Sequence, residues 1–226
     1  MEFCDILNSS QLVLFPDPRF ASIGAGTGAV LLVGADRESA IETIKRFHYT
    51  QSVSSGKSHY FRYGDVLISF SIPANKNLGK FLLGRSCQLW ELSRMWAPDG
   101  HERNALTRAI SVCIHAFQKL EPQVEALVSF ADPNVGHSGG VYLAASWTPT
   151  GRSEEGRYYI GPDNEIAARR KFHSGRKILR KAQIEALGYK EIKLPGKIRF
   201  VRGLDRKARR DIKHKWGNGQ RVKIEN

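Results

Sequence analysis

Side chains able to take part in acid–base chemistry follow a short apolar run, residues 126–130, whose composition is typical of a buried strand. Asp132 comes shortly after that run and stands before a proline. A carboxylate at such a position can act as a general base when it lies within hydrogen-bonding distance of the reacting group. Asp before Pro also starts ordinary turns, so the residue fits a purely structural role as well.

Hydroxyl and imidazole groups lie close to Asp132 in the sequence. Ser129 belongs to the apolar run, where it points either into a site or towards an internal partner. Tyr142 begins a predicted short helix, residues 141–147; it could donate to an oxyanion, stack on a ring or be a half-buried core residue. A glycine-rich turn between them contains His137, Ser138 and Gly139. We interpret those three as loop-shaping or substrate-positioning residues, because adjacent His and Ser rarely form a nucleophile–base pair.

A second group with chemical potential is His48 and Tyr49, at the end of a predicted helix, residues 38–47, and before a polar loop. Histidine is the commonest metal ligand, and both rings could instead contact a substrate. His48 and Asp132 with Tyr142 or His137 would make an oxygen and nitrogen set able to hold iron. Their spacing matches no recognised metal motif, so the metal stays unknown.

A strand, a loop and a helix are predicted in the middle of the chain, over residues 89–96, 97–103 and 104–120. Asn104 is a plausible N-cap of the helix. The start of a helix suits an anion such as a pyrophosphate, and Arg103 could add a charge-assisted hydrogen bond. The alternative is an ordinary turn with a solvated arginine. Ser93 and Arg94 in the strand either face a site or pair internally.

The remaining elements follow from hydrophobic periodicity and turn residues. Predicted strands cover residues 29–33, 59–63, 66–72, 126–130, 157–160 and 197–201, and further helices cover 174–187 and 205–216. Residues 50–58 and 76–86 are predicted loops. Gly24 to Gly28 precede a strand rather than follow one, which is wrong for a nucleotide-phosphate motif. The order predicts an α/β (α+β) fold, a mixed sheet with helices on its faces.

Composition is that of a globular protein: 226 residues, 41% hydrophobic and 25% charged. The apolar runs are too short to cross a membrane, and no basic start followed by an apolar stretch indicates a signal peptide. Cys4, Cys87 and Cys113 are odd in number and form no Cys-x-x-Cys pair. We predict free thiols in a reducing, cytoplasmic compartment.

Charge is concentrated at the C-terminal end. From Arg169 onwards there are 20 Lys and Arg residues against 5 Asp and Glu residues, a net charge of +15, whereas the rest carries −2. Such a segment is typical of a protein that binds a polyanion, and we predict nucleic acid rather than a membrane. The predicted phosphate contacts are Arg169, Arg170, Lys171, Arg176, Lys177, Arg180 and Lys181, with a second cluster over residues 206–215.

The order of elements around the central strand, loop and helix resembles the GNAT acyltransferase superfamily. In that superfamily the loop after the central strand holds the pyrophosphate of acyl-CoA. Here the corresponding stretch runs from Gly100 to Ala105 and lacks the glycines of the usual loop. The resemblance implies acyl-CoA (acetyl-CoA), or another acyl or aminoacyl donor, held by a set of residues from the strand and the loop. These are Ser93, Arg94, Arg103, Asn104 and Ala105.

A closer resemblance, over about residues 48–201, is to the phage Mom family of DNA adenine-modifying proteins. It is carried by His48-Tyr49, residues 91–94, residues 129–132 with Gly-His-Ser-Gly at 136–139, Tyr142 with residues 145–147, Gly151 and residues 197–201. The resemblance implies a GNAT-like fold and transfer of a carbamoylmethyl (methylcarbamoyl) group to the exocyclic amine of adenine in double-stranded DNA. This modification would protect phage DNA from host restriction enzymes.

By this resemblance the catalytic residues are Asp132, Tyr142, His48, Tyr49 and Ser129, with His137, Ser138 and Gly139 facing the substrate, and iron is a possible cofactor. The expected organisation is an N-terminal extension over residues 1–37, a catalytic domain over 38–203 and a basic helix and tail over 204–226. Two alternatives stay open. One is a non-catalytic nucleic-acid-binding protein on a GNAT-like scaffold, and the other is an acyltransferase for a small amine or protein.

Overall fold

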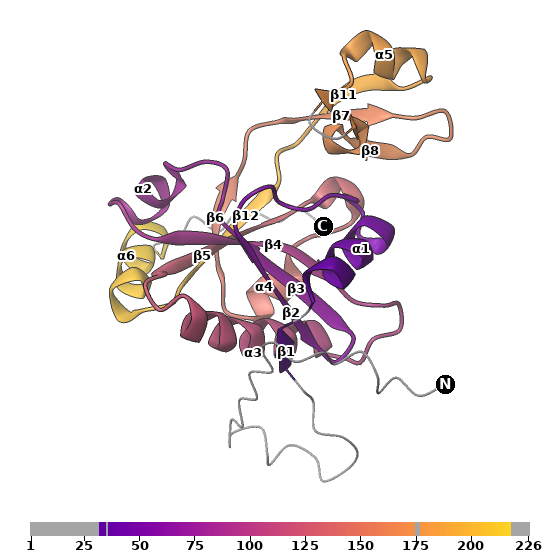
Figure 1. Ribbon diagram of the computed structural model, residues 1–226. Helices are drawn as coiled ribbons and strands as arrows, with labels where there is room; N and C mark the ends of the chain where they lie inside the picture. Colours follow the sequence, from indigo (N-terminus) through magenta and orange to yellow (C-terminus); the bar gives the residue numbers. More distant parts are fainter. Residues whose placement is uncertain (1–31, 35, 175–176, 218–226) are drawn as a thin grey trace, which may run out of the picture.

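The computed structural model describes residues 32–34, 36–174 and 177–217 (Figure 1). Within them the main sheet has seven strands, in the order β1-β2-β3-β4-β5-β12-β6. Neighbouring strands are antiparallel apart from β4 and β5. The strands are β1 Leu32–Gly34, β2 Ser58–Tyr63, β3 Val66–Ser71, β4 Leu89–Trp96, β5 Ala126–Ala131, β6 Thr148–Arg152 and β12 Ile198–Gly203.

The two central strands pair only briefly. The parallel ladder of β4 and β5 extends from Leu89 opposite Ala126 to Glu91 opposite Val128. Immediately beyond it, the Ser129 hydroxyl donates to the carbonyl oxygen of Leu92 at 2.8 Å. A side chain therefore takes over where the backbone ladder stops.

One face of the sheet packs on α3 (Ala105–Leu120) and α4 (Gly140–Ala144). The apolar stripe predicted from the sequence forms this contact, because Ile110, Cys113 and Phe117 of α3 are buried against Phe70 and Trp90 of the sheet. The predicted helix at the centre of the chain is thus confirmed. Asn104 occupies its N-cap position in a left-handed conformation (φ 64°), without a capping side-chain hydrogen bond.

The opposite face is covered at its two sides (Figure 1). Helix α1 (Arg37–Phe47), capped by the Asp36 side chain, packs Ala40 and Ile44 on Leu67. Helices α2 (Leu78–Leu83) and α6 (Arg206–Trp216) pack on the other side, around Val128 and Val201. The predicted mixed sheet with helices on its faces is confirmed.

Between β6 and β12 the chain leaves the sheet to form a separate lobe, residues 156–194, which projects from the body (Figure 1). Its three-stranded sheet has the order β11-β7-β8, and its core contains Tyr159, Phe172 and Ile184. The lobe consists of β7 Gly156–Ile160, β8 Ile166–Ala168, the short helix Arg169–Phe172, β9 His173–Ser174, β10 Lys177–Ile178, α5 Lys181–Ala186 and β11 Lys190–Leu194.

Several element predictions need correction. The helix predicted over 174–187 is wrong in its first half: Ser174 belongs to β9, and α5 begins only after Arg180. The predicted loop 76–86 contains α2, and β6, β8 and β11 were not predicted. The predictions for residues 1–31, including the glycine-rich turn and Cys4, lie outside the described residues. Cys87 and Cys113 are free.

Two features bear on the expected domain boundaries. The sheet already begins with β1, inside the segment expected to be an extension, and β1 pairs with β2. Helix α6 buries Ala208 and Ile212 against the sheet, so it contributes to the core of the body. No helix of the described chain has the length and apolar character needed to cross a membrane.

Candidate active site

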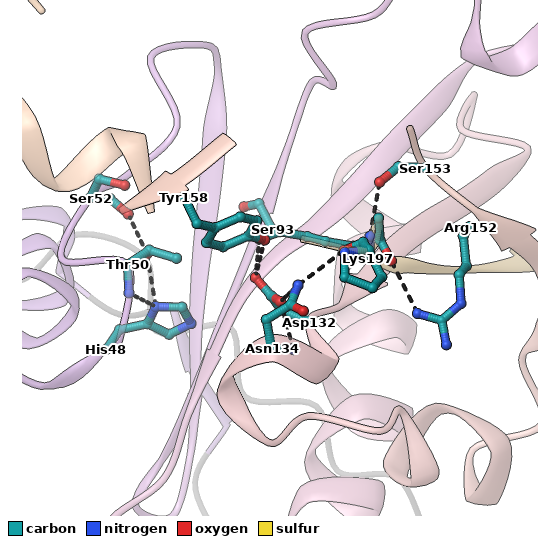
Figure 2. A network of polar contacts seen from close by, with 12 residues as sticks. His48, Thr50, Ser52, Ser93, Asp132, Asn134, Arg152, Ser153, Tyr158 and Lys197 are labelled. Carbon is teal, nitrogen blue, oxygen red and sulfur yellow. Dashed lines mark hydrogen bonds and ion pairs between the residues drawn. The ribbon is translucent and has the colours of Figure 1, made fainter. Parts of the chain in front are cut away.

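Asp132 is the centre of a buried polar network at the end of β5 (Figure 2). Its side chain has 0% exposure. One carboxylate oxygen accepts from the Tyr158 hydroxyl at 2.8 Å and lies 3.0 Å from Lys197 Nζ, and the other accepts from the backbone and side chain of Asn134. Burial opposes ionisation, but Lys197 and these hydrogen bonds outweigh it and hold the pKa of Asp132 below its usual value.

Sheet register explains how residues distant in the sequence meet here. In the antiparallel pair of β5 and β12, Ala131 lies opposite Ile198, so Asp132 and Lys197 flank the last paired position. Tyr158 comes from β7 at the base of the lobe. The network therefore joins the body of the protein to the lobe, and Asp132 is well placed to position Tyr158 and Lys197.

His48 is buried at the end of α1 and is fixed by the loop that follows it (Figure 2). The backbone N–H of Thr50 donates to its Nδ1 at 3.1 Å. Nδ1 is therefore an acceptor, which places the proton of the neutral ring on Nε2. Burial first, and then the charge of Arg94, lower the pKa of His48 to about 3. At neutral pH His48 is an uncharged donor through Nε2.

Arg94 holds the same loop through hydrogen bonds from its guanidinium group. It is buried, and its Nε donates to the carbonyl oxygen of Ser52 at 2.6 Å. Ser93 contacts the hydroxyl of Ser69 at 3.1 Å. Both residues from the predicted donor set thus have partners inside the protein, and Arg94 holds the loop that carries His48.

Tyr49, His137 and Lys197 form the accessible part of the site, next to the buried ring of His48. The Tyr49 ring, 40% exposed, lies 4.5 Å from that of His48 and 5.1 Å from that of His137. Lys197 Nζ lies 5.6 Å from the centre of the Tyr49 ring. Burial lowers the pKa of His137, with Lys197 acting in the same direction and Asp132 opposing it. His137 is therefore mainly neutral at pH 7 and able to accept a proton.

Ser129 and Tyr142 form a buried pair on the other side of β5. The Ser129 oxygen lies 2.8 Å from both the Leu92 carbonyl oxygen and the Tyr142 hydroxyl oxygen. A serine has one proton and a carbonyl can only accept, so Ser129 donates to Leu92 and Tyr142 donates to Ser129. Burial raises the pKa of Tyr142 to about 12. Its proton is already engaged in a hydrogen bond, which favours a positioning role.

The turn after Asp132 requires glycine at one position in particular. Gly139 has φ +86°, and a Cβ atom there would lie 2.3 Å from the Phe200 ring. That ring stacks on Tyr142 at 5.1 Å. Ser138 is exposed at the surface of the turn. Gly139 thus lets the turn close over the core and present His137 beside Tyr49.

Among the predicted donor-binding residues, Arg103, Asn104 and Ala105 lie in order at the start of α3. Arg103 and Asn104 are exposed, and Arg108 forms an ion pair with Glu102 at 2.7 Å beside them. A helix start with an exposed arginine fits the pyrophosphate of a coenzyme A donor. The short β4–β5 ladder opens at Leu92, where Ser129 and Tyr142 fill the space between the strands.

The predicted iron ligands do not fit a metal as they are arranged. Both oxygens of Asp132 are engaged, by Tyr158, Lys197 and Asn134. His48 accepts at Nδ1 and so carries a proton on Nε2, where a metal would need a lone pair. In the described part of the chain no three His, Cys, Asp or Glu side chains are grouped to hold a metal ion.

The predicted phosphate contacts fall in the lobe, separate from the second cluster on α6 (Figure 1). Arg169, Lys171, Arg180 and Lys181 are exposed there. Lys171 lies 3.9 Å from Glu165, and Lys181 lies 3.5 Å from Glu191. Arg176 and the side chains of Arg170 and Lys177 lie outside the described residues.

Sequence reasoning missed Tyr158, Lys197 and Asn134 as site residues. Lys197 begins a predicted strand, but only the pairing of that strand with β5 places it beside Asp132. Asn134 follows Asp132 by two residues, a spacing typical of an Asx turn, and that signal was available. Tyr158 has no such local signal.

Comparison with known proteins gives a consistent result. The model of the Mom protein family matches residues 30–218. A relative from Escherichia phage Mu, described as "Methylcarbamoylase mom", is 32% identical over 129 residues, which are 55% of this chain and 52% of that protein. The chain thus matches about half the length of this relative.

Among solved structures, a tandem GNAT protein from the clavulanic acid biosynthesis pathway overlaps 61% of this chain and 49% of its own. The identity is 8% and the TM-score 0.37, an overlap from which nothing further follows for this chain.

Proposed function

Because the chain belongs to the Mom protein family, we propose that it modifies DNA by transferring a carbamoylmethyl group to the exocyclic amine of adenine. The family match spans every side chain of the candidate site. In an infected host cell, the modification would protect phage DNA from restriction enzymes. The observation that carries the proposal is the Asp132 network, which sets Lys197 beside the exposed rings of Tyr49 and His137.

The adenine amine needs help to react, because its lone pair is delocalised into the ring. In the proposed step the amine nitrogen forms a bond to the donor carbon, the bond from that carbon to its leaving group breaks, and one amine proton departs. Neutral His137 is suited to take this proton. His48 donates from Nε2 to the substrate, and Asp132 keeps Lys197 in place.

Such a reaction on double-stranded DNA requires the adenine to leave the base stack. An extruded base would find an aromatic surface in Tyr49, which is 40% exposed. Lys197 lies at the same place and would meet a phosphate or the polar edge of the base. The exposed cations of the lobe, Arg169, Lys171, Arg180 and Lys181, would contact phosphates of the duplex.

The proposed binding site of the group donor is the start of α3. Arg103, Asn104 and Ala105 would hold the pyrophosphate of a coenzyme A derivative. A bound thioester would supply an activated carbonyl carbon, whereas a carbamoylmethyl product has a CH₂ group on the amine. We therefore propose that the reacting carbon of the donor is the CH₂ of a carbamoylmethyl group, which carries the leaving group, rather than the carbonyl carbon of an acetyl thioester.

The direct test is to express the chain in a restriction-deficient bacterium, digest the cellular DNA to nucleosides and analyse them by mass spectrometry. We expect a deoxyadenosine adduct with the mass of one carbamoylmethyl group. Asp132→Asn should lose the adduct, whereas Asp163→Asn, an exposed carboxylate at the far end of the lobe, should keep it. An adduct of different mass would contradict the proposed group.

If no adduct forms in uninfected cells, the same strains are infected with phage to provide any phage-dependent donor. Continued absence of a deoxyadenosine adduct would exclude the proposed reaction. In that case, retention of DNA binding would favour a non-catalytic nucleic-acid-binding protein.

A further inference from the structure

A second surface outside the candidate site combines exposed aromatic rings with cations. We call it the α2–α6 patch, and it consists of Phe81, Arg199, Lys215 and Trp216. Phe81 is 46% exposed, and its ring centre lies 4.5 Å from the Arg199 guanidinium carbon and 5.4 Å from Lys215 Nζ. The Trp216 ring lies 5.7 Å away.

Phe81 is not needed to dock α2 on the sheet. The residues that do so are Leu78, Leu82 and Leu83, which are between 0% and 7% exposed. Trp216 is likewise fixed, because its Nε1 donates to the carbonyl oxygen of Leu82 at 2.8 Å. The phenyl ring of Phe81 therefore lies on the outer side of α2, on a rigid support.

Among the described residues, no carboxylate forms an ion pair with the cations of the patch. Arg199 donates from Nε and Nη2 to the hydroxyl and carbonyl oxygens of Thr150, at 3.0 and 2.9 Å, and both acceptors are neutral. Burial lowers the pKa of Arg199. Within the described chain, no carboxylate lies at ion-pair distance from Arg199 or Lys215. The nearby Asp211 is bound to Arg85 at 2.9 Å. The patch thus offers uncompensated positive charge to an anion.

Strand β12 links this patch to the candidate site. Lys197 comes directly before β12 and Arg199 is the second residue of the strand, so both side chains leave the same end of it. Their Cα atoms are about 7 Å apart at the usual rise of a strand. Lys197 reaches Tyr49, whereas Arg199 reaches Phe81.

We propose that the α2–α6 patch binds a nucleotide that flanks the target adenine in the same DNA strand. Its base stacks on the exposed side of the Phe81 ring, and its phosphate meets Arg199 and Lys215. The assignment of the strand to DNA rests on the proposed function. Two exposed aromatic rings with nearby cations, Tyr49 and Phe81, would then hold two nucleotides of the strand that carries the extruded adenine.

Binding to a fluorescein-labelled oligodeoxynucleotide with one adenine among thymines tests this proposal by fluorescence anisotropy. Phe81→Leu keeps an apolar side chain but removes the aromatic face, so affinity should fall roughly tenfold. Phe81→Trp should bind at least as well as the unchanged chain. Arg199→Lys keeps the charge but loses the planar group and should weaken binding by about threefold to tenfold.

The matched control is Leu120→Ala, which removes an apolar side chain of similar exposure, 44%, from the end of α3. It should leave the affinity unchanged. Circular dichroism and thermal melting of each variant check that it remains folded. Wild-type affinity of a folded Phe81→Leu variant, or equal losses for Phe81→Leu and Leu120→Ala, would overturn the proposal.

The mass-spectrometric assay separates this inference from the proposed function. If the unchanged chain makes the deoxyadenosine adduct and Phe81→Leu neither binds less nor modifies less, the reaction stands and the patch assignment fails. If no strain makes an adduct but Phe81→Leu still loses oligonucleotide affinity, the patch binds nucleic acid and the reaction fails.

Discussion

Lys197, directly before β12, and Arg199, within it, are cations two residues apart in the sequence, yet their surroundings differ. Lys197 is neutralised by Asp132 at 3.0 Å, within a network that also fixes Tyr158 and Asn134. Arg199 is bound to two neutral oxygens of Thr150 and lies over an exposed phenyl ring. We call the first region closed, because its cation is paired with a carboxylate of the protein, and the second region open, because its cation is bound only to neutral oxygens.

The two surroundings suit a charged side chain to two different roles, catalysis and binding. A cation held by a buried carboxylate is fixed in position before any substrate arrives, which suits chemistry that depends on geometry. A cation without an acidic partner keeps its attraction for an anion, which suits binding. The experiments below disturb each region in turn and begin with the largest expected effect.

Substitution of Asp132 in the closed region should have the largest effect on both activity and stability. Asp132→Asn breaks the ion pair with Lys197 and removes charge from the hydrogen bonds of Tyr158 and Asn134. We expect loss of adduct formation and destabilisation by about 3 kcal/mol, measured by urea unfolding, as for a broken buried pair. Asp163→Asn, at an exposed position, should change stability by less than about 0.5 kcal/mol. Equal stability of the two variants would show that the network contributes little.

Substitutions of two glycines test how tightly the turn that contains His137 is constrained. Gly139→Ala combines a positive φ with a Cβ only 2.3 Å from Phe200 and should cost about 2 kcal/mol in unfolding free energy. Gly136→Ala has a similar φ, +83°, with no atom within 4 Å, and should cost about 1 kcal/mol. Thermal or urea unfolding measures both. If the two costs are equal, Phe200 does not constrain the turn.

His48 should make stability depend on pH. Its pKa falls from 6.5 to about 3 on folding, so the unfolded chain binds the proton first as pH decreases. Stability from this group is present above pH 6.5 and is lost towards pH 3, by at most about 1.4 kcal/mol per pH unit. Urea unfolding between pH 7 and 5, roughly the upper part of that range, should show a shallower dependence for His48→Gln. His115→Gln, at an exposed position on α3, should keep the original slope.

The open region can be compared with the lobe through the salt dependence of DNA binding. Lys215→Ala removes a cation without an acidic partner and should lower the slope of log affinity against log salt by about 0.9. Lys181→Ala removes a cation that already lies 3.5 Å from Glu191, so the slope should change less. The reverse order would move the main DNA contact to the lobe.

The central part of the fold could be predicted because its signals are local. The apolar stripe of α3, the hairpin of β2 and β3 and the Asp36 cap of α1 each depend on residues close together in the chain. In the lobe, the strand predicted over residues 157–160 is confirmed as β7, but the helix prediction fails in its first half because Ser174 and the apolar residues after it imitate a capped helix. The structure instead pairs Ser174 with Lys177 in a short hairpin.

The candidate site was predictable only in part for a related reason. His48, Tyr49, Asp132 and His137 stand out by residue type, and the structure places them around Lys197. The partners that change their chemistry come from distant segments. Thr50 sets the tautomer of His48, and Tyr158 and Lys197 occupy Asp132. A general base predicted from sequence thus becomes better suited to positioning once its neighbours are known.

The chain leaves the body for the lobe at Ser153 and returns at Lys197, and the contacts between these two residues determine which changes of sequence the main sheet tolerates. Ser153 and Lys197 exchange two hydrogen bonds, from the Ser153 N–H to the Lys197 carbonyl oxygen at 2.8 Å and from the Lys197 N–H to the Ser153 hydroxyl at 2.9 Å. A Cβ on Gly196 would collide with the Ser153 carbonyl oxygen at 1.9 Å, so the two segments touch. β6 and β12 therefore already form a closed hairpin below the lobe. Changes in the length of the lobe beyond Tyr158 should therefore leave the register of β6 and β12 unchanged, whereas loss of Tyr158 itself would remove a hydrogen bond to Asp132.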